Sequence, residues 1–200
     1  LSITDKVIKL VQAKYSSSGS EISLINSILL TNKSEEEAVK GLKAILSGKQ
    51  QKDLGRFVLI IPRYLVTQHY VKLPSTSPDE ISDMVRLQAA KQLPYNPQEM
   101  IIGYEIIRVT PEGYSEAMMT IMHQNTVKKY LDTLTKLGLE PQEIGIDSLG
   151  ICYWLALQGD IKAENPIMAI DLDTAYARID LLLSGKSIYS RAFLLTSGIT

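Results

Sequence analysis

The feature that most constrains the fold is a plan that occurs twice, once near each end of the chain. Residues 1–30 and residues 167–194 each read as a strand, a tight bend, a second strand, a Ser/Gly turn and a third strand. The two copies align in three pairs: Lys9 with Arg178, Ser2 with Asp171, and Thr4 with Asp173. Few residues are identical between the two copies, but the order of strands and turns is the same. The pattern predicts an internal duplication, with copies about 170 residues apart.

Helices and strands alternate in the segment between the two copies. One helix is expected where Ser34 and Glu37 form a capping box, and a second where Ser77 and Glu80 form another. The other expected elements are strands over 56–62, 64–73, 103–110, 115–123 and 141–148, and helices over 125–138 and around Cys152. This alternation predicts an α/β architecture.

A second level of organisation is visible in the middle of the chain. The run from Pro74 to Gly138 has its own helix, two strands and helix, which indicates an inserted α+β subdomain. The expected division is 1–73 and 139–166 for a first subdomain, 74–138 for the insert, and 167–200 for the start of a second subdomain. Because the chain begins at Leu1 and ends just after a strand, we expect it to be part of a longer protein.

Composition excludes several classes of function. The 21 basic and 22 acidic residues of the 200 give a net charge of −1, so nucleic acid and direct membrane insertion are not expected. No apolar run approaches the roughly 18 residues of a membrane helix, and no signal peptide is visible. The single cysteine, Cys152, excludes an internal disulfide and favours a reduced, cytosolic setting in which it packs as a core residue.

Three stretches resemble the PilM proteins of type IV pilus assembly, which have an actin-like, ribonuclease H-like ATPase fold. They are RFVLIIPRYLVTQHYVKLPSTSPDEISDMVRLQAAKQLPYNPQEMIIGYEII, LGLEPQEIGIDSLGICYWLA and AIDLDTAYARIDLLLSGKSIYSRAFLLTSGIT. The resemblance implies a first actin-like subdomain, a small inserted subdomain and the first strands of the second half. It also implies a cytoplasmic scaffold, held at the inner membrane by its partners.

In actin-like ATPases two bends hold the phosphates of ATP, each with an Asp for magnesium and a glycine that lets the backbone approach phosphate. The corresponding residues here are Ser2, Thr4 and Asp5 in the first bend and Asp171, Asp173 and Thr174 in the second. Thr4 and Asp173 stand in the glycine places. A carboxylate about 4 Å from a phosphate oxygen costs about 1–4 kcal/mol. We therefore expect bends that keep their shape without a cofactor. A working ATP and magnesium site, or a remodelled metal or nucleotide site, remains an alternative.

The resemblance also implies partners. A short cytoplasmic N-terminal peptide of a PilN-like bitopic membrane protein is the expected ligand, with a motor ATPase as a second partner. Five residues are expected to line the peptide site: Arg63, Tyr64, Leu65, Met119 and His123. No catalytic residue or metal site is expected, because His69 and His123 lack ligand partners at metal-binding spacing. The alternative scaffold is the cytoplasmic L-protein domain of a type II secretion system, which shares this fold.

Overall fold

The computed structural model describes residues 1–4, 6–17, 19–31, 34–46, 48–92, 96–157, 165–172 and 176–195. The chain forms two compact units. The first comprises Leu1–Pro62 and Val127–Ile146, and the second comprises Arg63–Thr126 and Asp147–Thr200. Within the described residues, no helix has both the length and the apolar character needed to cross a bilayer.

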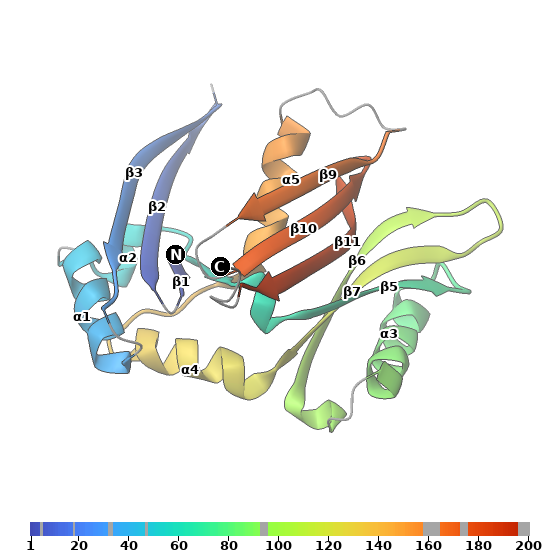
Figure 1. Ribbon diagram of the computed structural model, residues 1–200, viewed down its shortest axis with the longest axis horizontal. Coiled ribbons are helices and arrows are strands. Elements are labelled where there is room, and N and C mark those ends of the chain that lie inside the picture. The colour runs from blue at the N-terminus through green and yellow to red at the C-terminus, as the bar shows by residue number, and fades with distance from the viewer. Residues whose placement is uncertain are drawn as a thin grey trace. The chain divides into compact units, whose positions relative to one another are not determined.

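A five-stranded sheet forms the first unit (Figure 1), in the order β3-β2-β1-β4-β8. Its strands are β1 (Ser2–Ile3), β2 (Val7–Ser16), β3 (Gly19–Leu29), β4 (Val58–Ile61) and β8 (Glu143–Ile146). The first three strands pair antiparallel, whereas β4 runs parallel to β1 and β8 runs parallel to β4. β4 and β8 are adjacent in the sheet although about 80 residues of chain separate them, which requires a crossover connection.

The same unit contains helices α1 (Glu35–Leu46) and α2 (Gln51–Leu54) and all of α4 (Gln124–Thr135) except its first three residues. α1 packs against β2 and β3. Its buried Leu42, Ile45 and Leu46 are three and four residues apart, as expected for one apolar helix face. Gly41 allows close packing, since a Cβ there would lie 3.0 Å from Ile8 Cδ1.

The α1 N-terminus has the serine cap that was predicted from sequence. Ser34 Oγ accepts a hydrogen bond from the Glu37 N–H. The Glu37 carboxylate also accepts from the main-chain N–H and the hydroxyl of Thr31. The helix start is therefore capped by Ser34, and Glu37 ties it to the chain that precedes it.

The second unit contains two three-stranded sheets. The first, in the order β5-β7-β6, consists of β5 (Thr67–Leu73), β6 (Met100–Val109) and β7 (Ser115–His123), all antiparallel. Helix α3 (Pro78–Gln92) covers one face of it (Figure 1). Ile81, Val85 and Ala89 of α3 are buried against Val71, Leu73, Ala117, Met119 and Ile121 of the strands. Two short 3-10 turns, η1 (Arg63–Leu65) and η2 (Pro97–Glu99), precede β5 and β6.

Antiparallel pairing joins the other three strands of this unit in the order β11-β10-β9: β9 (Ile167–Leu172), β10 (Tyr176–Leu183) and β11 (Lys186–Leu194). Helix α5 (Asp147–Leu157) lies beside this sheet in Figure 1 and contacts β11. Buried and partly exposed residues alternate along β10, so successive side chains face opposite sides of the sheet.

The duplicated plan predicted from sequence is confirmed at the level of strand register. Ser2 pairs with Lys9 across β1 and β2, and Asp171 pairs with Arg178 across β9 and β10. These are the residues that the sequence alignment superimposes. In each copy a third antiparallel strand then follows, β3 or β11.

Two local expectations need correction. The predicted strand over 64–73 begins as the η1 turn, and only Thr67–Leu73 pairs as a strand. At α3 the Glu80 carboxylate accepts a hydrogen bond from the Ser75 hydroxyl, in place of the predicted capping box with Ser77. The division of the whole protein into subdomains stays a prediction.

Candidate functional site

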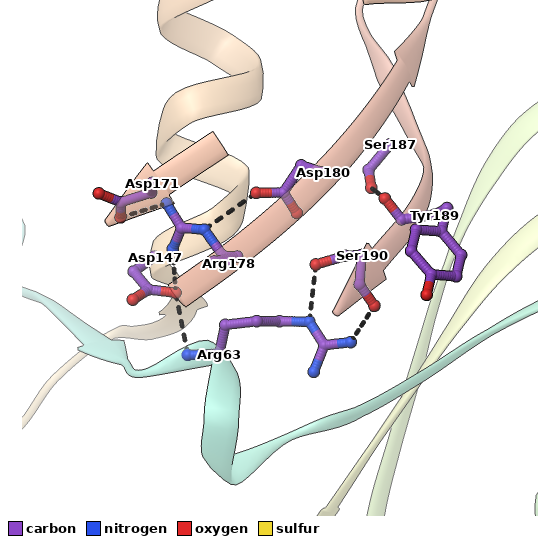
Figure 2. A network of polar contacts seen from close by, with 8 residues as sticks. All are labelled: Arg63, Asp147, Asp171, Arg178, Asp180, Ser187, Tyr189 and Ser190. Atoms are coloured by element: carbon purple, nitrogen blue, oxygen red, sulfur yellow. Dashed lines mark hydrogen bonds and ion pairs between the residues drawn. The ribbon is translucent and has the colours of Figure 1, made fainter. Parts of the chain in front are cut away.

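A buried arginine in the second unit is surrounded by acidic side chains. Arg178 of β10 is 2% exposed and lies among three carboxylates (Figure 2). Its Nη2 atom is 3.1 Å from Asp171 Oδ2, its Nη1 atom 2.8 Å from Asp147 Oδ1, and its Nε atom 2.9 Å from Asp180 Oδ2. We call Arg178 and these three aspartates the Arg178 network.

Local structure explains how the network assembles. Asp180 is two residues after Arg178 in β10, so both side chains project from the same face of the sheet. Asp171 is the cross-strand partner of Arg178 on β9. Asp147 is the first residue of α5, where a carboxylate also interacts favourably with the helix dipole. The network therefore joins both strands of one hairpin to the start of a helix.

The contacts differ in quality. The Nε and Nη1 atoms of Arg178 are close to their carboxylates without good hydrogen-bond alignment, so these contacts are ion pairs rather than directed hydrogen bonds. A buried guanidinium is costly unless carboxylates compensate it. Three carboxylates do so here, and this makes the arginine and its partners mutually dependent.

A second buried arginine, Arg63 of η1, is 5% exposed. Its Nε atom donates to Ser190 Oγ at 2.8 Å and its Nη2 atom donates to the Ser190 carbonyl oxygen at 2.5 Å, while Nη1 donates to the Val66 carbonyl oxygen. Its main-chain N–H donates to Asp147 Oδ1 at 2.9 Å. Asp147 therefore contacts both arginines, as Figure 2 shows.

Burial determines the protonation behaviour of these groups. It raises the pKa of Asp147 and of Asp180 above the ordinary aspartate value, and the charge of Arg178 opposes both shifts. Burial likewise lowers the pKa of Arg63, against the opposing charges of Asp180 and Asp147. The Cys152 thiol on α5 has its pKa raised to about 11, chiefly by burial and then by the charge of Asp180. Cys152 is 2% exposed, as expected for a core residue, and its thiol is protonated at neutral pH.

The network has a direct consequence for cation binding. Asp171 is the residue expected to hold magnesium if the second bend were a working phosphate site, and its carboxylate already lies next to the Arg178 guanidinium. Within the described residues there is no group of three or more His, Cys, Asp and Glu side chains arranged to hold a metal ion. Asp173 and Thr174, the other residues expected at this bend, lie outside the described residues.

At the first bend, the backbone N–H groups are bound by the Thr4 side chain of the same bend. Thr4 Oγ1 accepts from the Val7 N–H at 3.0 Å and from the Lys6 N–H at 3.3 Å, and donates to the Val7 carbonyl oxygen at 3.0 Å. Ser2 is paired with Lys9 in the β1–β2 ladder, and Asp5 lies outside the described residues. A phosphate-binding bend directs its backbone N–H groups to the ligand. At this bend, two such groups bind the Thr4 hydroxyl.

The five residues expected to line a peptide site fall into different environments. Arg63 and Tyr64 line a groove of about 450 Å³ in the second unit, and the Tyr64 ring lies 5.2 Å from the Tyr176 ring. Leu65 ends the η1 turn and does not line this groove. Met119 is fully buried in the core under α3. His123 ends β7, with Nε2 3.4 Å from Glu99 Oε2.

Sequence reasoning did not select Arg178, Asp147, Asp180 or Ser190 as site residues. One signal was available: Arg178 and Asp180 are charged residues in the otherwise apolar run ARIDLLL, separated by one position and therefore on one face. Such a pair in a predicted inner strand must be compensated. No comparable signal connects Asp147 or Arg63 to this strand, because both come from distant segments.

Comparison with known proteins gives a fold but no sequence relative. No family model and no curated protein matches the chain. Over 98% of its length it matches a chain in the solved structure of the PilM-PilN type IV pilus biogenesis complex, with a TM-score of 0.81 and 16% identity. Over 97% it matches the cytoplasmic domain of EpsL, an inner membrane component of the type II secretion system of Vibrio cholerae, with a TM-score of 0.59 and 11% identity.

The chain spans 60% of the length of the first of these proteins and 68% of the second. At such low identities the likeness establishes the fold alone. The predicted fold is thereby confirmed: the chain has the PilM-like form of the actin-like α/β fold, with an α+β insert.

Proposed function

We propose that the chain is a scaffold component of an inner-membrane assembly for type IV pili, which binds the short cytoplasmic peptide of a PilN-like bitopic membrane protein. The single observation that carries this proposal is the match to the PilM-PilN complex over 98% of the chain. On this view the protein resides in the cytoplasm and reaches the inner membrane through its partners. A motor ATPase is a second candidate partner.

The two bends favour a scaffold over an ATPase. At the second bend the Arg178 guanidinium neutralises Asp171, which would otherwise attract a divalent cation. At the first bend the Thr4 hydroxyl binds the N–H groups of Lys6 and Val7, which are then not directed to a phosphate. These contacts support a fold that keeps its shape without ATP or magnesium.

The competing proposal within the same fold is an active ATPase that binds ATP and magnesium. It requires Arg178 to release Asp171 and the Thr4 hydroxyl to release the bend, which costs several hydrogen bonds and ion pairs. A second alternative keeps the scaffold role but places it in type II secretion, and the match to the EpsL cytoplasmic domain favours it.

Binding of a defined peptide tests the proposed function. The full-length protein is titrated into a fluorescent peptide that corresponds to the cytoplasmic N-terminus of the PilN-like protein of the same organism, with a scrambled peptide as control. Saturable binding of the native peptide alone supports a pilus scaffold. Equal binding of both peptides, or binding of neither by folded protein, contradicts it. Preferential co-purification with type II secretion components would assign the chain to that system instead.

A further inference from the structure

A small pocket in the first unit is lined by lysines. Its volume is about 320 Å³, and it is formed by the end of α1, the turn after α1 and the end of α4. Three of its six lining residues are basic and none of the six is acidic. The six are Lys43, Leu46, Gly48, Lys49, Lys136 and Leu137. We call this site the lysine pocket.

Charge is distributed unequally between the two units. The first unit contains 12 basic and 9 acidic residues, a net charge of +3, whereas the second contains 9 basic and 13 acidic residues, a net charge of −4. The near-neutral balance of the whole chain therefore conceals a positive unit. Part of the excess lies in the segment that lines the pocket, because residues 38–52 contain four lysines and no aspartate or glutamate.

The partners of these three lysines leave positive charge uncompensated. Lys49 is half-buried, and its ammonium group donates to the neutral Gln12 Oε1 at 2.9 Å. Lys43 is exposed and makes no side-chain hydrogen bond or ion pair with the residues that the structure describes. Lys136 Nζ is 2.5 Å from Glu35 Oε1, but these side chains are 54% and 48% exposed. An exposed pair of this kind contributes little, so Lys136 can exchange its partner for another anion at small cost.

The helix dipole explains only part of this arrangement. A lysine in the last turn of a helix interacts favourably with the negative end of the dipole, and this accounts for Lys43. Lys49 lies beyond the end of α1, after Gly48, and its side chain reaches Gln12 on β2. A cation that is partly removed from water and contacts only a neutral oxygen is stabilised by an anion nearby. The pocket therefore has the electrostatic character of an anion site.

We propose that the lysine pocket binds a phosphate group, carried by the headgroup of an anionic phospholipid or present as free phosphate. Each ammonium group has three N–H donors, and phosphate oxygens accept charge-assisted hydrogen bonds from them. A volume of about 320 Å³ is at the small end of the range for ligand pockets, which suits a headgroup or a phosphate ion. The pocket shares no residue with the two bends or with the expected peptide site, so this proposal does not depend on the proposed scaffold function.

Two binding experiments test the proposal and separate the two sources of phosphate. In the first, the full-length protein is floated with vesicles of phosphatidylcholine alone or of phosphatidylcholine mixed with phosphatidylglycerol. In the second, it is titrated with sodium phosphate at constant ionic strength and followed by NMR. Binding that requires phosphatidylglycerol, without binding of free phosphate, identifies the lipid headgroup, and the reverse result identifies free phosphate. Binding in both experiments means that the pocket accepts phosphate from either source. Binding in neither experiment overturns the proposal.

Matched double variants separate the pocket from a general effect of charge. Lys43→Gln combined with Lys136→Gln should weaken binding by about tenfold or more, since each lysine near an anionic surface contributes roughly fivefold. Lys9→Gln combined with Lys14→Gln removes the same charge from exposed positions of β2 in the same unit and should leave binding nearly unchanged. Lys43→Arg combined with Lys136→Arg keeps both charges and should retain binding. Equal losses in the two glutamine variants, or no loss in the pocket variant, overturn the proposal.

Discussion

At the scale of single residues, Arg178 links three acidic side chains that would otherwise repel one another. Asp147, Asp171 and Asp180 come from α5, β9 and β10, and each lies within 3.1 Å of the guanidinium. Removal of one partner from a buried ion pair typically costs more than the pair itself contributes, because an uncompensated charge remains buried.

Arg178→Met should therefore lower the free energy of unfolding by about 3–5 kcal/mol. Urea denaturation at pH 7 measures the change. Arg178→Lys is the matched control, because it keeps the positive charge but loses the planar fork that reaches three carboxylates, so its loss should be smaller. An Arg178→Met variant as stable as the parent would show that the network is not compensated by this arginine.

The pH dependence of stability tests the raised pKa of Asp180, a residue that is 1% exposed. Its pKa is raised in the folded protein, mainly by burial, so the folded state holds this proton to higher pH than the unfolded state does. The stability of the parent should accordingly fall as pH rises from the ordinary aspartate value of about 4 through the raised pKa.

Asp180→Asn lacks this titration. The stability difference, parent minus Asp180→Asn, should be larger at pH 4 than at pH 7, as measured by denaturation of both proteins at each pH. Cys152→Ser serves as a control for a change at a neighbouring buried position that does not titrate in this range. A difference that grows towards neutral pH would mean that the ionised form of Asp180 is favoured by folding.

At the scale of secondary-structure elements, the two hairpins show what the sequence could and could not predict. Their shared register followed from the alignment of Lys9 with Arg178, because strand alternation fixes which residues face each other. The same reasoning could not place Asp147 or Arg63. Hydrophobic alternation indicates the side of a sheet on which a residue lies, but not which distant element covers that side. Arg63 and Ser190, for example, are 127 positions apart.

Thr4 is predicted to stabilise the first hairpin bend. Thr4→Val removes a hydroxyl that makes three hydrogen bonds around Lys6 and Val7, and should lower the free energy of unfolding by about 1–2 kcal/mol. Thermal and urea denaturation measure the loss. Thr135→Val is the control, since that exposed hydroxyl donates to a carbonyl of its own helix, and its effect should stay within about 0.5 kcal/mol.

Substitution of Met119 distinguishes a role of this residue in the core from a role in partner binding. Its side chain is fully buried between α3 and the sheet, so Met119→Ala should lower the free energy of unfolding by about 2–5 kcal/mol through the cavity it creates. Met168→Ala, at a position that is 59% exposed, is the control and should have little effect on stability. If Met119→Ala leaves stability unchanged but weakens peptide binding, the packing described for α3 is incorrect.

At the scale of the whole molecule, the sequence predicts the fold better than it predicts the functional state of the bends. The alternation of strands and helices and the duplicated hairpin could be predicted from sequence, because hydrophobic periodicity and turn residues encode them locally. The state of the phosphate bends depends on contacts across elements, which only the structure supplies. The protein therefore combines an actin-like ATPase fold with bends whose described residues make their contacts within the protein itself.

Calorimetric titration of the full-length protein with ATP and magnesium tests this account most directly. We predict no magnesium-dependent binding heat for the parent protein, because Arg178 neutralises Asp171 and the Thr4 hydroxyl occupies the N–H groups of the first bend. Saturable, magnesium-dependent binding of ATP that is lost in the Asp171→Asn variant would contradict the account and identify an active nucleotide site.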